Sequence, residues 1–242
     1  MGRCYTFDPM ESSITVENRS WRWIELILLF IAAPASLYFV RREFGPLIIP
    51  TLLVTSSLAL VILLRDRDFD RRQLGGNGEV IAGLKSILRT FIPGAALIAA
   101  GLVVFEPELL FRFPRREPWM WAFVMVAYPL LSVYPQELLF RTYFFQRYAP
   151  ILRTTQACVL WSAFSFGVAH LFFANWVAPT LTAIGGYLFA RTYARSRSTV
   201  LVTLEHALWG DFLFTIGLGW YFWGGSLRVV ANAATGGGDV SP

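Results

Sequence analysis

Long apolar runs separated by short polar breaks dominate the pattern of hydrophobic and polar positions in this chain. A helix that crosses a bilayer needs roughly 20 mainly apolar residues. The predicted spans are, in chain order, 21–40, 46–64, 87–105, a long run from 118 to 148, 156–176, 180–192 and 199–222. The pattern therefore predicts an all-α, polytopic transmembrane helical bundle of about seven spans, within a range of roughly six to eight.

The fourth run differs from the others because a proline and two charged residues interrupt it. Gln136, Glu137 and Arg141 follow Pro135, and apolar residues continue on both sides. We therefore predict one long helix that is kinked or locally loosened at Pro135. Glu137 and Arg141 are four residues apart, so they lie on one face of a helix and can pair. Ionisable side chains at membrane depth are costly, which makes this pair a candidate for a functional site.

Composition supports a membrane protein and defines its organisation. The chain of 242 residues is 55% hydrophobic and 15% charged, whereas soluble domains contain about 25% charged residues. We divide the chain into four parts: a polar N-terminal segment (1–20), N-terminal transmembrane helices (21–117), a helical core (118–223) and a C-terminal tail (224–242). Within these parts, Pro93–Gly94 predicts a kink, Gly185–Gly186 predicts close approach of a neighbouring helix, and 236–242 predicts disorder.

The net charge of +5 comes almost entirely from arginine. The arginines lie mainly in the short polar breaks, where they act as orientation signals and contact lipid headgroups. We therefore expect the lipid bilayer as a partner, no nucleic acid, and an N-terminus in the cytoplasm. The short chain favours a bacterial inner membrane.

Two cysteines, Cys4 and Cys158, are too few for a disulfide framework or a thiolate metal site.

Both histidines of the chain, His170 and His206, lie inside predicted spans. At 1.5 Å per residue, they and Glu137 fall within several ångströms of one depth in a core about 30 Å thick. Two hydrolytic arrangements are open. Glu137 and an imidazole could activate water directly, or His170, His206 and Glu137 could hold a divalent metal such as zinc. Glu205 and Asp211 lie on the last span but need not share this site.

The polar residues of these spans resemble the motifs of the CPBP family, which comprises the type II CAAX prenyl endopeptidases and the bacterial Abi proteins. That family shows Glu-Glu-x-x-x-Arg, then Phe-x-x-x-His, then His-x-x-x-Asn or Asp. The corresponding segments here are Gln136–Arg141, Phe166–His170 and His206–Gly210. The chain departs from the pattern at Gln136, which replaces the first glutamate, and at Gly210, with Asp211 one position later.

The resemblance implies an intramembrane endopeptidase that hydrolyses a peptide bond of a membrane-associated or membrane-delivered peptide or protein. It implies catalytic positions at Glu137, Arg141, His170, His206 and Gln136. The first glutamate is the residue usually assigned to activating water, and an amide cannot accept that proton. Our hypothesis is that Glu137, or Glu137 with His170, activates water and that His206 polarises the carbonyl.

Two other functions remain open from the sequence. Gln136 and Gly210 suit a non-catalytic CPBP-fold protein of the interaction or immunity type. Glu137 and His170 could instead serve as a proton relay in a proton-coupled carrier, although no inverted repeat is evident in the sequence. A prenylated substrate is not expected in a bacterial protein.

Overall fold

A computed structural model describes residues 16–75 and 80–222 of the chain, and every regular element within these ranges is a helix. This confirms the predicted all-α fold. The predictions for Cys4 and for the tail at 236–242 lie outside the described residues.

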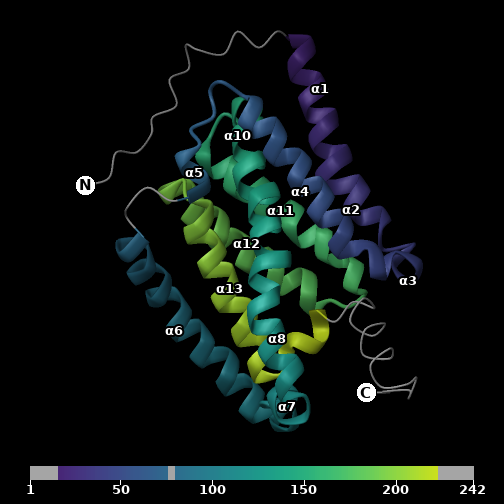
Figure 1. Cartoon of the computed structure of the whole chain (residues 1–242), viewed down its shortest axis with the longest axis vertical. Coiled ribbons are helices and arrows are strands. Elements are labelled where there is room, and N and C mark those ends of the chain that lie inside the picture. The colour runs from purple at the N-terminus through teal and green to yellow at the C-terminus, as the bar shows by residue number, and fades with distance from the viewer. Residues whose placement is uncertain (1–15, 76–79, 223–242) are drawn as a thin grey trace.

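The N-terminal half consists of helices that surround the core of the protein from two sides. Figure 1 shows α1 and α2 at one edge and α6 at the opposite edge. The elements are α1 (Val16–Ile27), η1 (Leu28–Ala32), α2 (Ala33–Ser36), α3 (Arg41–Phe44), η2 (Gly45–Leu47), α4 (Ile48–Arg65), α5 (Arg72–Gly75), α6 (Val80–Phe105), η3 (Pro107–Leu109) and α7 (Arg112–Arg116).

The C-terminal half contains the long helix and three further helices that pack beside it. Its elements are α8 (Pro118–Tyr128), η4 (Pro129–Val133), α9 (Tyr134–Glu137), η5 (Leu138–Tyr143), α10 (Phe144–Leu152), α11 (Thr155–Ala169), η6 (His170–Phe173), α12 (Val177–Ser196), α13 (Thr199–Ile216) and η7 (Leu218–Phe222).

Five helices in the described residues are long and apolar enough to cross a membrane. They are Arg41–Arg65, Ala82–Phe105, Pro118–Leu152, Thr155–Phe173 and Thr199–Ile216. The other two predicted spans are also helical, in α1–α2 and in α12, but they do not meet the same criteria of length and hydropathy. Large apolar side chains such as Leu97 and Phe105 are 75% and 81% exposed, which suits surfaces that face lipid tails.

The helix from 118 to 152 runs without interruption through Pro135, as the sequence predicts. Wide π turns, η4 and η5, lie on the two sides of the short segment α9 that contains the proline. Proline has no backbone N–H and crowds the preceding turn, and π turns are a common way to absorb such a disturbance. Local loosening at Pro135 is therefore confirmed. The helix ends at Leu152, and Arg153 adopts a positive φ of 65°.

Small residues bring α11 and α12 close together beside the long helix. A Cβ atom on Gly186 would lie 3.2 Å from the Cα atom of Ala163 and 3.2 Å from the ring of Phe166. A side chain at position 186 would require α11 to shift by a few tenths of an ångström, so the predicted close approach is confirmed at Gly186. Gly185 instead faces the ring of Phe189 on its own helix. The close contact places the aromatic rings of both helices around the polar residues of the long helix.

Candidate active site

Glu137 and Arg141 form a fully buried ion pair on the long helix. Arg141 Nε lies 3.1 Å from Glu137 Oε2, and both side chains are 0% exposed. The guanidinium lies over the ring of Phe166 at 4.3 Å and near the ring of Phe189 at 5.5 Å. Its Nη2 also donates to the carbonyl oxygen of Gly186 at 3.3 Å. Charge pairing, ring faces and a backbone acceptor thus hold Arg141 inside the bundle.

His206 joins this pair from α13. Its Nδ1 lies 2.7 Å from Glu137 Oε1, and its ring stacks on Phe189 with 4.6 Å between centroids. An ionised carboxylate can only accept hydrogen bonds, so Nδ1 carries the hydrogen and donates it. Glu137 therefore uses one oxygen for Arg141 and the other for His206, and it fixes the orientation of the imidazole.

Tyr128, at the end of α8, completes a chain of polar contacts. Its hydroxyl lies 3.0 Å from Nε2 of His206. A Cβ atom on Gly210 would lie 2.8 Å from Cζ of Tyr128, so the phenol occupies the space beside position 210. The family motif has an amide or acid at this position. Sequence reasoning missed Tyr128, because it lies outside the motifs in the apolar first part of the long helix.

His170 stands apart from the three residues just described. Its Nδ1 lies 2.7 Å from the carbonyl oxygen of Phe166, and the carbonyl can only accept, so Nδ1 carries the hydrogen. The ring of Phe166 packs against both histidines, at 4.6 Å from His170 and 5.4 Å from His206. The structure thus brings Glu137 and His206 into direct contact and links His170 to them through Phe166. In the neutral ring, Nε2 of His170 is an open acceptor.

Gln136 lies next to Glu137 but bonds elsewhere. Its Nε2 donates to Ser132 Oγ at 2.7 Å. Its Oε1 is buried and accepts no hydrogen bond within the described part of the chain. Buried carbonyl oxygens are normally paired, so this oxygen can still accept a hydrogen bond from water or substrate.

Two further carboxylates lie on α13, and the sequence left their roles open. Glu205 is 2% exposed, and its Oε2 has no hydrogen-bond partner in the described part of the chain. Asp211 follows Gly210 on a helix that is regular from Thr199 to Ile216. It is therefore rotated by about 100° from the direction of residue 210, and it does not replace the missing motif side chain.

The side chains do not form a ready metal site as they are arranged. Within residues 16–75 and 80–222, no three His, Cys, Asp or Glu side chains are grouped so that they could hold a metal ion. Both ring nitrogens of His206 already have partners, and Glu137 is shared between His206 and Arg141. A metal held by His170, His206 and Glu137 would require these contacts to break.

Comparison with known proteins places these residues in a family. A search of curated proteins and a search of solved structures found no match. A family model described as type II CAAX prenyl endopeptidase Rce1-like matches residues 118–212. The match includes Tyr128, the Glu137–Arg141 pair and both histidines. The motifs and this match agree, and both support a relationship of residues 118–212 to the CPBP family.

Proposed function

We propose that this protein is an intramembrane endopeptidase that hydrolyses a peptide bond of a membrane-associated or membrane-delivered peptide or protein. The observation that carries the proposal is the buried chain of contacts from Glu137 through His206 to Tyr128. A carboxylate that orients an imidazole, which in turn contacts a hydroxyl, is a common arrangement in enzymes that hydrolyse acyl bonds. The family match independently supports peptidase chemistry.

His170 is the best base for activating water. Glu137 accepts from His206 through Oε1, and its Oε2 forms an ion pair with Arg141 without a hydrogen bond. Because both oxygens face groups of the bundle, Glu137 serves better to orient His206 than to take a proton. His170 donates through Nδ1 to Phe166, which leaves the lone pair of Nε2 available. The role that the sequence assigned to Glu137 or to Glu137 with His170 therefore passes to His170.

Gln136 supports the same step without taking a proton. Its unpaired Oε1 can accept one hydrogen of the water molecule while the other hydrogen moves to His170. An amide oxygen can orient water in this way, although it cannot act as the base at neutral pH.

Tyr128 and His206 stabilise the negative charge that develops on the carbonyl oxygen. In the neutral ring of His206, Nδ1–H donates to Glu137 and Nε2 accepts the hydroxyl hydrogen of Tyr128. When substrate binds, the hydroxyl of Tyr128 turns this hydrogen to the scissile carbonyl oxygen. Donors of this kind, held in a dry site, are worth about 10²–10³ in rate.

The steps balance as follows. A water proton moves to Nε2 of His170 while the water oxygen bonds to the carbonyl carbon, and the electrons of the carbonyl π bond move to its oxygen. His170 then gives the proton to the amide nitrogen, the carbonyl re-forms and the C–N bond breaks. The products are a carboxylic acid and an amine, and His170 returns to its neutral form.

The test uses full-length protein in lipid nanodiscs with a library of membrane-anchored peptides, and mass spectrometry detects new N-termini. We expect cleavage by the unmodified protein and loss of cleavage in His170→Ala and Tyr128→Phe. Tyr148→Phe is the matched control, because Tyr148 is also buried on the long helix but its hydroxyl donates to Glu25 at 3.0 Å. Cleavage that survives His170→Ala would contradict the proposed base. The absence of any cleavage would favour the non-catalytic alternative.

A further inference from the structure

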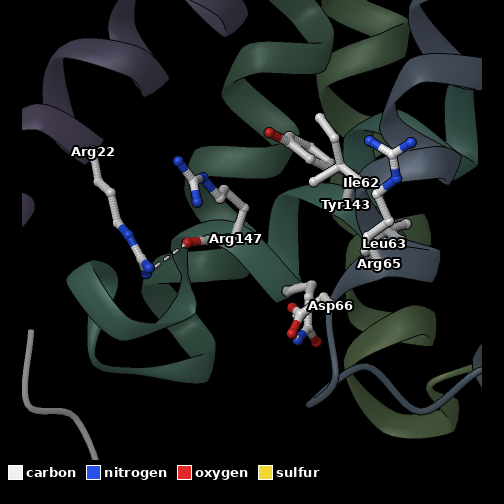
Figure 2. Close-up of a pocket in the computed structure, with 8 residues that line it drawn as sticks. Arg22, Ile62, Leu63, Arg65, Asp66, Tyr143 and Arg147 are labelled. Carbon is white, nitrogen blue, oxygen red and sulfur yellow. Dashed lines mark hydrogen bonds between the residues drawn. The ribbon is translucent and has the colours of Figure 1, made fainter.

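A pocket of about 420 Å³ lies away from the candidate active site, between α1, α4 and the end of the long helix. Three arginines line it together with apolar and polar side chains. Figure 2 shows Arg22 and Arg147 on one side of the pocket and Arg65 on the other. The remaining lining residues are Ile62, Leu63, Asp66, Tyr143 and Gln146.

Positive charge in this pocket exceeds the negative charge that could balance it. Arg147 is neutralised, because its Nε and Nη2 donate to the two oxygens of Glu25 at 2.9 and 2.6 Å. Asp66 accepts from Gln146 at 2.9 Å rather than from an arginine.

Two of the arginines lack a carboxylate partner. Within the residues that the structure describes, Arg22 donates one hydrogen bond, to the carbonyl oxygen of Arg147. The side chain of Arg65 makes no hydrogen bond or ion pair with any residue that the structure describes. The three arginines carry three positive charges, and Asp66 and Glu25 carry two negative charges, so one positive charge remains. The pocket is therefore suited to a monovalent anion.

The position of Arg65 indicates what kind of anion this is. Arg65 is the last residue of α4, a helix that is long and apolar enough to cross a membrane. Val54, Leu58, Val61 and Ile62 are all large and exposed on α4, with exposed fractions of 43–60%. Residues spaced by three, four or seven positions share a helix face, so these side chains and Arg65 form one stripe. An acyl chain can lie along the apolar part of this stripe, with its headgroup at Arg65.

We propose that the pocket binds the phosphate of an anionic phospholipid whose acyl chain lies along α4. Arg22 and Arg65 supply the charge, and Ile62 and Leu63 contact the first carbons of the chain. A phosphodiester carries one negative charge, which matches the excess in the pocket. Basic pockets between membrane helices are suited to lipid headgroups for this reason. The proposal does not depend on peptidase activity, because none of these residues belongs to the candidate active site.

Native mass spectrometry of delipidated full-length protein tests the proposal. The protein is titrated separately with phosphatidylglycerol, with phosphatidylcholine and with inorganic phosphate. We expect phosphatidylglycerol to bind more tightly than phosphatidylcholine, and phosphate alone to bind much more weakly than either lipid. Arg65→Gln and Arg22→Gln should each weaken binding of phosphatidylglycerol by about five-fold and weaken binding of phosphatidylcholine less, because its choline cation offsets the charge of the phosphate.

Arg42→Gln is the matched control. Arg42 is also exposed and also makes no polar contact within the described residues, but it lies in α3, near the opposite end of α4. Its replacement should leave binding of both lipids unchanged. Arg65 has no protein partner, so Arg65→Gln should unfold at the same temperature as the unmodified protein. Equal binding of the two lipids, or equal weakening by Arg42→Gln, would overturn the proposal. Binding of inorganic phosphate as tight as that of the lipid would show a simple anion site and overturn the lipid assignment.

Discussion

The phenol ring of Tyr128 occupies the space that a side chain on Gly210 would need. A Cβ atom at position 210 would lie 2.8 Å from Cζ of Tyr128, which is shorter than any normal van der Waals contact between carbon atoms. The polar group that reaches His206 thus comes from α8, whereas the family motif supplies a polar side chain from the position of Gly210 on α13. A side chain at position 210 and the phenol ring of Tyr128 would occupy the same space, so the chain has Tyr128 together with glycine at position 210.

This relationship predicts the effect of enlarging residue 210. Gly210→Ala should destabilise the protein by roughly 1–3 kcal/mol, because overpacking forces neighbouring groups to move. The measurement is thermal unfolding in detergent. Gly101→Ala is the control: Gly101 also lies inside a helix, but no atom lies within 4 Å of its added Cβ. That change should be neutral or slightly stabilising.

The same pair predicts a size exchange. The double variant Tyr128→Ala/Gly210→Asn should be more stable than the sum of the two single changes implies, because the smaller residue 128 makes room for the larger residue 210. Additive losses of stability would show that the two residues do not compete for the same space.

The buried Glu137–Arg141 pair predicts an asymmetry between single and double changes. Arg141→Met should cost about 3–5 kcal/mol of stability, because it leaves the carboxylate of Glu137 buried without a cation. Adding Glu137→Leu should recover part of this loss, although His206 then loses its acceptor. Chemical denaturation in mixed micelles provides the comparison. Arg116→Met, at an exposed site, should change stability little, and an equal loss there would argue against a special role for the pair.

The different surroundings of the two histidines predict different kinetic losses. His170→Gln should lower the turnover rate by about 10²–10⁴-fold with little change in KM, because it removes a base and keeps a polar side chain. Tyr128→Phe should also lower turnover while it keeps the ring that packs beside Gly210. Steady-state kinetics with any peptide that the protein cleaves would measure both. A change confined to KM would mean that these residues bind substrate only.

The partners of His206 predict how the protein responds to removal of metal. Because Glu137 and Tyr128 engage both ring nitrogens, we expect chelators to leave peptide cleavage unchanged and purified protein to lack stoichiometric zinc. Elemental analysis of the unmodified protein and of His206→Ala would test this. Stoichiometric zinc that is lost in His206→Ala would establish the metal mechanism, and it would mean that His206 exchanges its present partners for the ion.

Much of the architecture is readable in the sequence because membrane helices follow local hydropathy. The continuous helix through Pro135 and the close approach at Gly186 follow from nearby residues, whereas the long helix ends at Leu152 rather than at the predicted residue 148. The spans in α1–α2 and α12 carry a weaker signal, since polar residues that face other helices lower their hydropathy.

The arrangement of the site could be predicted only in part, because it depends on contacts between distant segments. Depth along each helix placed Glu137 and His206 at one level, and they do touch. The depth of a residue in the membrane does not specify how its helix is rotated. It therefore could not show that the ring of His170 faces the carbonyl oxygen of Phe166. Tyr128 carries no motif, and only the packing of α8 against α13 reveals its contact with His206.

The length of the motif helix has a consequence for where the protein can work. At 1.5 Å per residue, its 35 residues span about 52 Å, whereas the hydrocarbon layer is about 30 Å thick. An upright helix would project into water, so it must tilt, bend at its π turns or extend beyond the bilayer. Each response depends on bilayer thickness. Membranes of different thickness would therefore set different angles between this helix and α13. The distance between the carboxylate of Glu137 and the imidazole of His206 would change with this angle.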